Sequence, residues 1–204
     1  MAAVVLSPHL DDAVLSCWHL LSGPGELRVI NVFAGLPSGD VGWWDEMTGA
    51  TDSRVRVRER RAEDRAALAI AGREAVNLDL LEAQYRVNGS APAALEAVLP
   101  HLSPDDLVCV PAALRPHRDH ELVRGTGLAL RARGFEVCFY ADLPSPTSGI
   151  LLEFAPVLRP RVRELEGHEL ERKLTAVECY ATQMTALQRV VPLNGLRREV
   201  VWGP

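Results

Sequence analysis

Short apolar runs alternate with longer helical patterns along the whole of this 204-residue chain, and this alternation constrains the fold most strongly. Such an alternation predicts β-α units, and therefore a mainly parallel sheet covered by helices on both faces. Because we find no internal repeat and no linker, we expect one α/β domain of three layers over residues 1–204. The predicted strands cover residues 2–7, 27–34, 76–80, 107–111, 136–141, 150–154 and 199–202, and the predicted helices cover 13–21, 55–71, 92–99, 120–133 and 168–187.

The composition argues against several classes of function. The net charge is −5, from 22 basic and 27 acidic side chains, so the chain lacks the basic surplus of a nucleic-acid-binding protein. Its apolar runs are far too short to span a bilayer, and no basic segment precedes the first run as it would in a signal peptide. The four cysteines contain no CxxC pair. We therefore predict buried, reduced thiols and a cytoplasmic protein.

Two polar clusters directly follow two of the predicted strands. His9, Asp11 and Asp12 come after the first strand, and His117 and His120 come after the strand at residues 107–111. Because ligands bind beyond the carboxyl ends of parallel strands, we expect both clusters at one edge of the sheet. Two histidines and one carboxylate can hold a zinc ion and leave a position open for water. Asp11, as a spare carboxylate, could then take the proton of that water.

Each cluster also has a plainer interpretation. An aspartate before a helix can be an N-cap, which stabilises the helix by roughly 1 kcal/mol. A cap needs only one aspartate, however, and it explains neither His9 nor the adjacent charges of Asp11 and Asp12, which repel each other. The three-residue spacing of His117 and His120 is weak on its own, because it often arises by chance. One of these two could bind a metal while the other faces the substrate. Together, the clusters favour a metal-dependent hydrolase.

A long polar loop predicted at residues 35–53 is the next candidate for a functional segment. We predict that Trp44 and Asp45 form part of a substrate mouth, where the indole stacks on a sugar ring and the carboxylate accepts a hydroxyl hydrogen bond. Packing of the adjacent Trp43 and Trp44 in the core is an equally good interpretation. The arginine-rich run at residues 54–65 is interleaved with acidic residues, so we expect a solvated or ion-paired helix face there and no phosphate site.

The two clusters resemble the signatures of the PIG-L (LmbE-like) zinc deacetylases. The matching segments are Pro8-His9-Leu10-Asp11-Asp12, His117-Arg118-Asp119-His120, Arg60-Arg61-Ala62-Glu63-Asp64 with Gly72, Gln84-Tyr85-Arg86, Tyr140-Ala141-Asp142-Leu143-Pro144, and Lys173 with Tyr180 and Gln183. The resemblance implies a Rossmann-like fold. It also implies a zinc ion bound by His9, Asp12 and His120, with Asp11 as the general base. A further implication is that His117 is a general acid or oxyanion stabiliser oriented by Asp119.

The function implied by this resemblance is removal of the acetyl group from a 2-acetamido sugar. We therefore predict a deacetylase with one Zn²⁺ per chain, or Fe²⁺ or another divalent metal in its place. Its predicted partner is a small N-acetylated amino sugar of the N-acetylglucosamine type, or a conjugate of one. Arg60, Glu82 and Tyr85 join Trp44 and Asp45 as predicted substrate-binding residues. Two alternatives stay open: an amidase that cleaves a larger acyl group or a thiol conjugate, and a non-catalytic Rossmann-like binding domain. The sequence makes no prediction of the oligomeric state.

Overall fold

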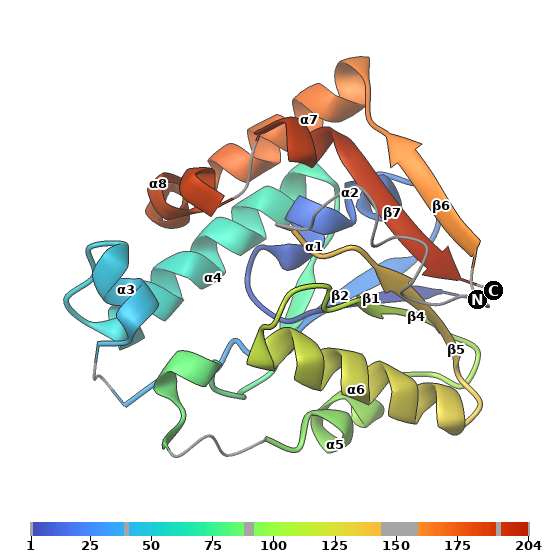
Figure 1. Cartoon of the computed structure of the whole chain (residues 1–204), viewed down its shortest axis with the longest axis horizontal. Coiled ribbons are helices and arrows are strands. Elements are labelled where there is room, and N and C mark those ends of the chain that lie inside the picture. Colours follow the sequence, from blue (N-terminus) through green and yellow to red (C-terminus); the bar gives the residue numbers. More distant parts are fainter. Residues whose placement is uncertain (1, 39–40, 88–91, 144–158, 191–192, 204) are drawn as a thin grey trace.

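A twisted sheet forms the centre of the molecule (Figure 1). The computed structural model describes residues 2–38, 41–87, 92–143, 159–190 and 193–203, and within them the sheet has seven strands in the order β3-β2-β1-β4-β5-β7-β6. The neighbours from β3 to β5 pair in parallel, whereas β7 pairs antiparallel with both β5 and β6. The strands are β1 (Ala3–Ser7), β2 (Leu27–Asn31), β3 (Ala75–Asn77), β4 (Leu107–Pro111), β5 (Glu136–Tyr140), β6 (Arg159–Glu164) and β7 (Arg198–Gly203).

Helices cover both faces of this sheet, so the predicted three-layer α/β fold is confirmed (Figure 1). Successive side chains of a strand point to opposite faces. Val5 of β1 accordingly packs in a core with α1, α4 and α7, whereas Val4 and Leu6 pack in a second core with α5 and α6. The helices are α1 (Asp12–Ser16), α2 (Trp18–Leu21), α3 (Trp43–Met47), α4 (Ser53–Ile70), α5 (Ala94–Val98), α6 (Arg118–Ala132), α7 (Gly167–Glu178) and α8 (Ala181–Val190).

The helix predicted at residues 13–21 is in fact two short helices, α1 and α2, separated at Cys17. The cause lies far away in the sequence. The carboxylate of Glu199 on β7 accepts the backbone N–H groups of Trp18 and His19, each at 2.8 Å, and so supplies the first partners of α2. Glu199 is itself paired with the buried ammonium of Lys173 on α7 at 2.6 Å. The carboxylate of a buried ion pair between α7 and β7 therefore holds the start of α2.

The helix predicted at residues 168–187 also divides, into α7 and α8, because α4 supplies partners at the break. The hydroxyl of Tyr180 donates to Asp64 Oδ1 at 2.9 Å. The backbone N–H and the hydroxyl of Thr182 both donate to the carboxylate of Glu63 at 2.7 Å, which satisfies the first turn of α8. Ala181 is exposed at this break. Four apolar side chains of α7 and α8 pack in or against the core: Leu170, Leu174, Val177 and Met184.

The C-terminal edge of the sheet differs from the prediction. The sequence pattern does not predict β6, because all six of its residues are exposed and only its backbone pairing with β7 makes it a strand. The strand predicted at residues 150–154 lies outside the described residues. All four cysteines are free, but Cys179 is half-buried, so the prediction of buried thiols holds for only three. In the part of the chain that the structure describes, no helix has the length and apolar character needed to cross a bilayer.

Candidate metal and active site

The two predicted polar clusters meet where the strand order reverses, between β1 and β4. In open parallel sheets this is the point at which ligands bind, beyond the carboxyl ends of the strands. His9 follows β1, and His117 and His120 lie just before and within the first turn of α6, which follows β4. The ring centroid of His9 is 5.0 Å from that of His117 and 5.2 Å from that of His120. The sheet topology therefore joins two segments that are far apart in the sequence.

Asp12 lies between two of these histidines. Its Oδ2 atom is 3.2 Å from His9 Nδ1 and 3.5 Å from His120 Nε2, and it also accepts the backbone N–H of His9 at 2.9 Å. Burial opposes the charge on Asp12, but the charges of His120 and His9 outweigh it and hold the pKa of this carboxyl below its ordinary value. Two imidazole nitrogens and one carboxylate oxygen converging on one point are a donor set of catalytic divalent-metal sites. The residues present therefore fit a divalent metal.

A second carboxylate holds the far ring nitrogen of each of these histidines. His9 Nε2 is 3.0 Å from Asp119 Oδ2, and His120 Nδ1 is 2.8 Å from Asp142 Oδ2. A carboxylate behind a histidine fixes the ring and its tautomer, which leaves the other nitrogen to bind a metal. His9 thus presents Nδ1 and His120 presents Nε2, the two atoms that face Asp12. The sequence predicted no role for Asp142, although this residue directly follows a predicted strand and lies in the Tyr140-Ala141-Asp142-Leu143-Pro144 segment that resembles the family.

The side chain of Ser7 explains why Asp11 is free. Ser7, the last residue of β1, accepts the backbone N–H of Ala13 at 3.0 Å and donates to the carbonyl of His9 at 2.6 Å. It therefore takes the place of an aspartate N-cap, and Asp11 makes no side-chain cap hydrogen bond, so the capping interpretation is wrong for this residue. The Asp11 carboxylate lines the pocket beside the cluster. Burial, and then the charge of Asp12, raise the pKa of Asp11 to about 7, a value suited to a general base near neutral pH.

Asp119 does not orient His117 in the way that was predicted. Its carboxylate is buried and directed to three other groups: the ring of His9, the guanidinium of Arg86 at 2.7 Å and the backbone N–H of Ala83 at 2.9 Å. The reason is topological, because the segment at residues 82–86 passes beside the first turn of α6 and brings its own donors. Asp119 is therefore a positioning residue behind His9, which corrects its predicted role.

His117 itself is exposed at the rim of the pocket. Desolvation of the ring by the surrounding pocket, and then the charges of His9 and His120, lower its pKa to about 4. One ligand atom from each of the three histidines lies within 4.8 Å of the others. His117 is thus close enough to act on a group bound at the cluster, or to join the ligands. The buried Asp12, already in contact with both of the other rings, is the better third ligand.

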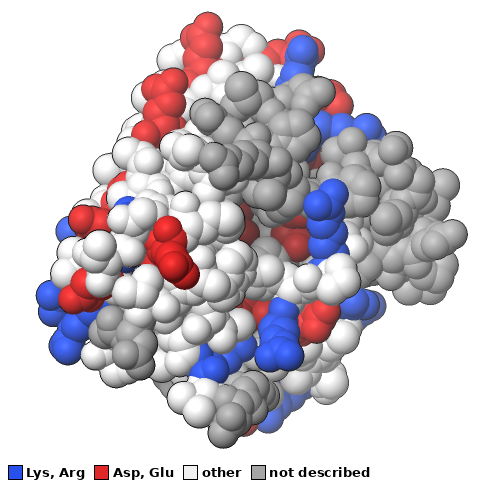
Figure 2. Space-filling model, turned by 60° about the vertical axis from the view of Figure 1, so that its left-hand side comes forward, with Lys and Arg blue, Asp and Glu red and all other residues white. Residues whose placement is uncertain are grey.

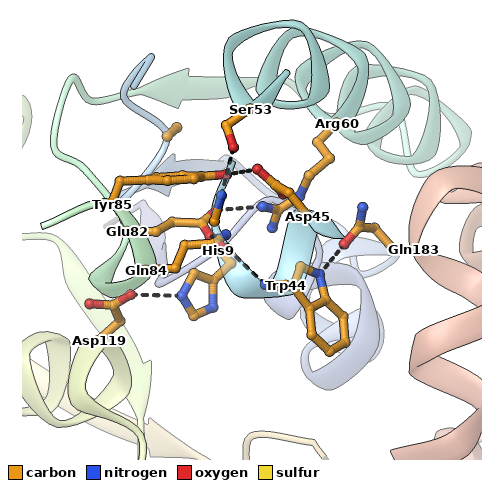
Figure 3. Close-up of polar contacts among 12 residues, drawn as sticks. His9, Trp44, Asp45, Ser53, Arg60, Glu82, Gln84, Tyr85, Asp119 and Gln183 are labelled. Carbon is orange, nitrogen blue, oxygen red and sulfur yellow. Dashed lines mark hydrogen bonds and ion pairs between the residues drawn. The ribbon is translucent and has the colours of Figure 1, made fainter. Parts of the chain in front are cut away.

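A pocket of about 270 Å³ opens in front of the cluster. Figure 2 shows this face of the molecule, which is hollowed, with acidic side chains visible inside the hollow. Arg60 and Glu82, two residues whose substrate-binding role stays a prediction, line the pocket and form a buried ion pair at 2.6 Å (Figure 3). The rest of the wall is mainly apolar and includes Leu15, Trp43, Trp44, Leu143 and Leu187.

The arginine-rich helix α4 is less solvated than predicted. Arg60 and Asp64 are both buried, because α4 packs across the sheet and these two side chains point inward. Asp64 accepts a hydrogen bond from Asn31 of β2 at 2.7 Å in addition to the one from Tyr180. The prediction offered a solvated or an ion-paired helix face, and Arg60 is ion-paired. Its partner is Glu82, however, and not an acidic residue of the same helix.

The segment predicted as a loop at residues 35–53 contains the helix α3, and its side chains divide between two roles. Trp44 lines the pocket, and it is held by two hydrogen bonds: its backbone N–H to Gln84 at 3.1 Å and its indole N–H to Gln183 at 2.5 Å (Figure 3). Asp45 is fully buried and accepts the hydroxyl of Tyr85 at 2.5 Å. Asp45 and Tyr85 thus lie behind the pocket wall and hold α3 in place, which corrects their prediction as substrate ligands.

Comparison with known proteins finds the same fold in a class of deacetylases. The A40926 pseudoaglycone deacetylase has a TM-score of 0.78 and 28% identity, over 99% of this chain and 96% of that one. A zinc inhibited form of teicoplanin deacetylase has a TM-score of 0.74 over 99% of this chain and 97% of that one, with 23% identity, and this likeness bears on the fold alone. The 2'-N-acetylparomamine deacetylase of Niallia circulans is 26% identical in an alignment of 184 positions, and the match covers 70% of this chain and 67% of that protein.

The family follows from the sequence match. The family described as PIG-L, GlcNAc-PI de-N-acetylase, matches residues 4–130, which include both polar clusters. This match spans more than half of the 204 residues, and the chain therefore belongs to the PIG-L family. The prediction of an enzyme that hydrolyses a C–N amide bond is confirmed by the family and by relatives that are named deacetylases, and the alternative of a non-catalytic binding domain is set aside.

Proposed function

We propose that this chain is a zinc-dependent deacetylase that removes the N-acetyl group from an amino sugar of the N-acetylglucosamine type carried on a conjugate. One observation carries this proposal: Asp12 Oδ2 lies between His9 Nδ1 and His120 Nε2, and a carboxylate holds each ring from behind. The names of the paromamine and pseudoaglycone relatives support an amino-sugar conjugate as the substrate class.

His9, Asp12 and His120 would hold the metal ion in this proposal. When bound, a divalent ion polarises an amide carbonyl and lowers the pKa of water, which makes water a stronger nucleophile at neutral pH. Zinc suits two imidazoles and one carboxylate, and iron(II) is the first alternative for the same donors. The carboxylates Asp119 and Asp142 would keep both rings oriented toward the ion.

The chain's own groups would move the protons of the reaction. Water adds to the amide carbon, the C–N bond breaks, and the products are acetate and a free amine. Asp11, which lines the pocket and has a raised pKa, takes a proton from the attacking water and returns it to the departing nitrogen. His117, at the rim, donates a hydrogen bond to the amide oxygen as negative charge develops there.

The remaining polar wall would bind the sugar. Arg60 and Glu82 place a guanidinium and a carboxylate on the pocket surface, and together they can donate to and accept from adjacent hydroxyls. Trp44 presents a rigid aromatic surface beside them. The proposed location is the cytoplasm, since four free cysteines suit a reducing compartment. The proposed partner is a small molecule.

Metal analysis combined with acetate release tests the proposal. The purified chain should contain about one divalent ion per molecule, lose acetate release after chelation, and regain it when zinc or iron(II) is restored. Because one related structure is of a zinc inhibited form, zinc should be titrated from below one equivalent upward. His9→Ala should lose both metal and activity, whereas His168→Ala, at an exposed position on α7, is a matched control that should keep both.

Two results would contradict the proposal. A chain that binds no divalent metal would remove its basis. Release of longer acyl groups in strong preference to acetate, from the same sugar, would instead identify the amidase alternative.

A further inference from the structure

We propose that the mouth of the pocket contains a subsite for an apolar aglycone, with Trp43 as its platform. This inference rests on the proposed function and adds the chemical class of the group that the sugar carries. The sugar would carry an aryl or alkyl group at its glycosidic position, so a free monosaccharide or a sugar with a small polar substituent would be a poorer substrate.

Exposed apolar side chains are concentrated around α3. In the described part of the chain, eight large hydrophobic residues are exposed, and half of them fall within residues 41–55: Val41, Trp43, Met47 and Val55. Trp43 is 63% exposed and Met47 is 49% exposed, and their spacing of four residues on a helix places them on one face. Single exposed apolar residues are ordinary, but a cluster beside a pocket is typical of a binding surface.

The exposed cluster is continuous with the active-site pocket. Trp43 is exposed to solvent and also lines that pocket, together with Leu187 of α8. Its ring contacts Trp44 edge-on, with centroids 5.7 Å apart and an interplanar angle of 80°. Trp44 is in turn anchored to Gln183 and Gln84 by hydrogen bonds (Figure 3). The platform is therefore supported from behind, so a ligand would meet a surface that needs little ordering.

The difference in exposure along the apolar wall indicates which region would hold the acyl group and which would hold the aglycone. Leu15 and Leu143 are only 3% and 8% exposed, and the backbone N–H of Leu143 is fixed by the hydroxyl of Ser16 at 3.1 Å. Such a closed surface suits a small acyl group. A group lying on Trp43 would instead stay partly in solvent, as a large aglycone that extends out of the pocket does. The apolar group at Trp43 is therefore assigned to the aglycone and not to the acyl chain.

The test compares two glycosides of N-acetylglucosamine that differ only in the aglycone, phenyl against methyl, on the metal-loaded enzyme. The readout is the ratio of their kcat/KM values for acetate release. The wild type should favour the phenyl glycoside by about tenfold, the ratio that 1.4 kcal/mol produces. Trp43→Ala should bring this ratio close to one, and Trp43→Phe should restore most of it. Leu128→Ala, at a residue 48% exposed on α6, is the matched control and should leave the ratio unchanged.

Each outcome has a distinct meaning. Equal kcat/KM values for the two glycosides, or a preference that survives Trp43→Ala, would overturn the subsite. A Trp43→Ala effect that follows the length of the N-acyl chain and not the aglycone would also overturn it, because the apolar surface would then serve the acyl group. If no glycoside releases acetate, the proposed function fails. Calorimetric titration with the phenyl and methyl glycosides then tests the subsite, which requires tighter phenyl binding that Trp43→Ala removes.

Discussion

Replacement of Asp142 should weaken metal binding even though this residue would not touch the ion. Asp142 Oδ2 is 2.8 Å from His120 Nδ1, and the two residues are only 6% and 5% exposed. A hydrogen bond to a charged group is worth about 1.5–3 kcal/mol. At 1.4 kcal/mol for each factor of ten, its loss corresponds to roughly a 10–100-fold weaker metal affinity. This agrees with the roughly 10–100-fold effect typical of carboxylates behind metal-binding histidines.

Two substitutions separate the effect of the charge of Asp142 from the effect of its hydrogen bond to His120. Asp142→Asn keeps an acceptor oxygen for the His120 ring but removes the charge, so affinity should fall by about tenfold. Asp142→Ala leaves the ring nitrogen without this partner, so the loss should approach about 100-fold. Competition with a chelator of known affinity measures both. Asp106→Asn is the matched control, since Asp106 is also buried but pairs with Arg28 at 2.6 Å, away from the cluster.

The outcome that would refute this reasoning is specific. If Asp142→Ala folds normally by circular dichroism and binds the metal as tightly as the wild type, the ring of His120 does not depend on Asp142. The assignment of Nε2 as the ligand atom of His120 would then lose its support.

Three further changes have expected outcomes. Asp11→Asn should keep metal content and thermal stability but lower kcat by roughly 10²–10⁴-fold, measured by acetate release, and full activity would exclude Asp11 as the base. Lys173→Met should lower the free energy of unfolding by about 3–5 kcal/mol in urea titration, because it leaves Glu199 charged and buried, and an unchanged midpoint would contradict this. Burial opposes the charge of Glu199, but Lys173 and His19 outweigh it and lower its pKa from 4.5 to about 2. The stabilisation from Glu199 should therefore be complete above about pH 4.5 and disappear as the pH falls through about 2. It amounts to about 3 kcal/mol at 1.36 kcal/mol per pKa unit, and Glu199→Gln should flatten this part of the stability curve.

The sequence alone was enough to predict the class of fold and the side chains that could bind a metal. Local alternation of apolar runs with helical patterns is enough to predict parallel strands, since each run and its period are properties of adjacent residues. The strand predicted at residues 107–111 matches β4. Histidine and aspartate directly after two predicted strands were enough to predict that both clusters lie at one sheet edge, because parallel strands all end on the same side.

Tertiary structure alone decided which groups pair. Asp119 faces His9 and not His117, and Asp142 faces His120, because the segments that carry them come together only when the sheet is assembled. The same holds for both divided helices, whose breaks depend on carboxylates from β7 and α4. Asp45 could be read from sequence as a substrate ligand, but the fold buries it against Tyr85. Sequence spacing specifies neighbours along one element, whereas the distance and direction between side chains on different elements depend on how those elements pack.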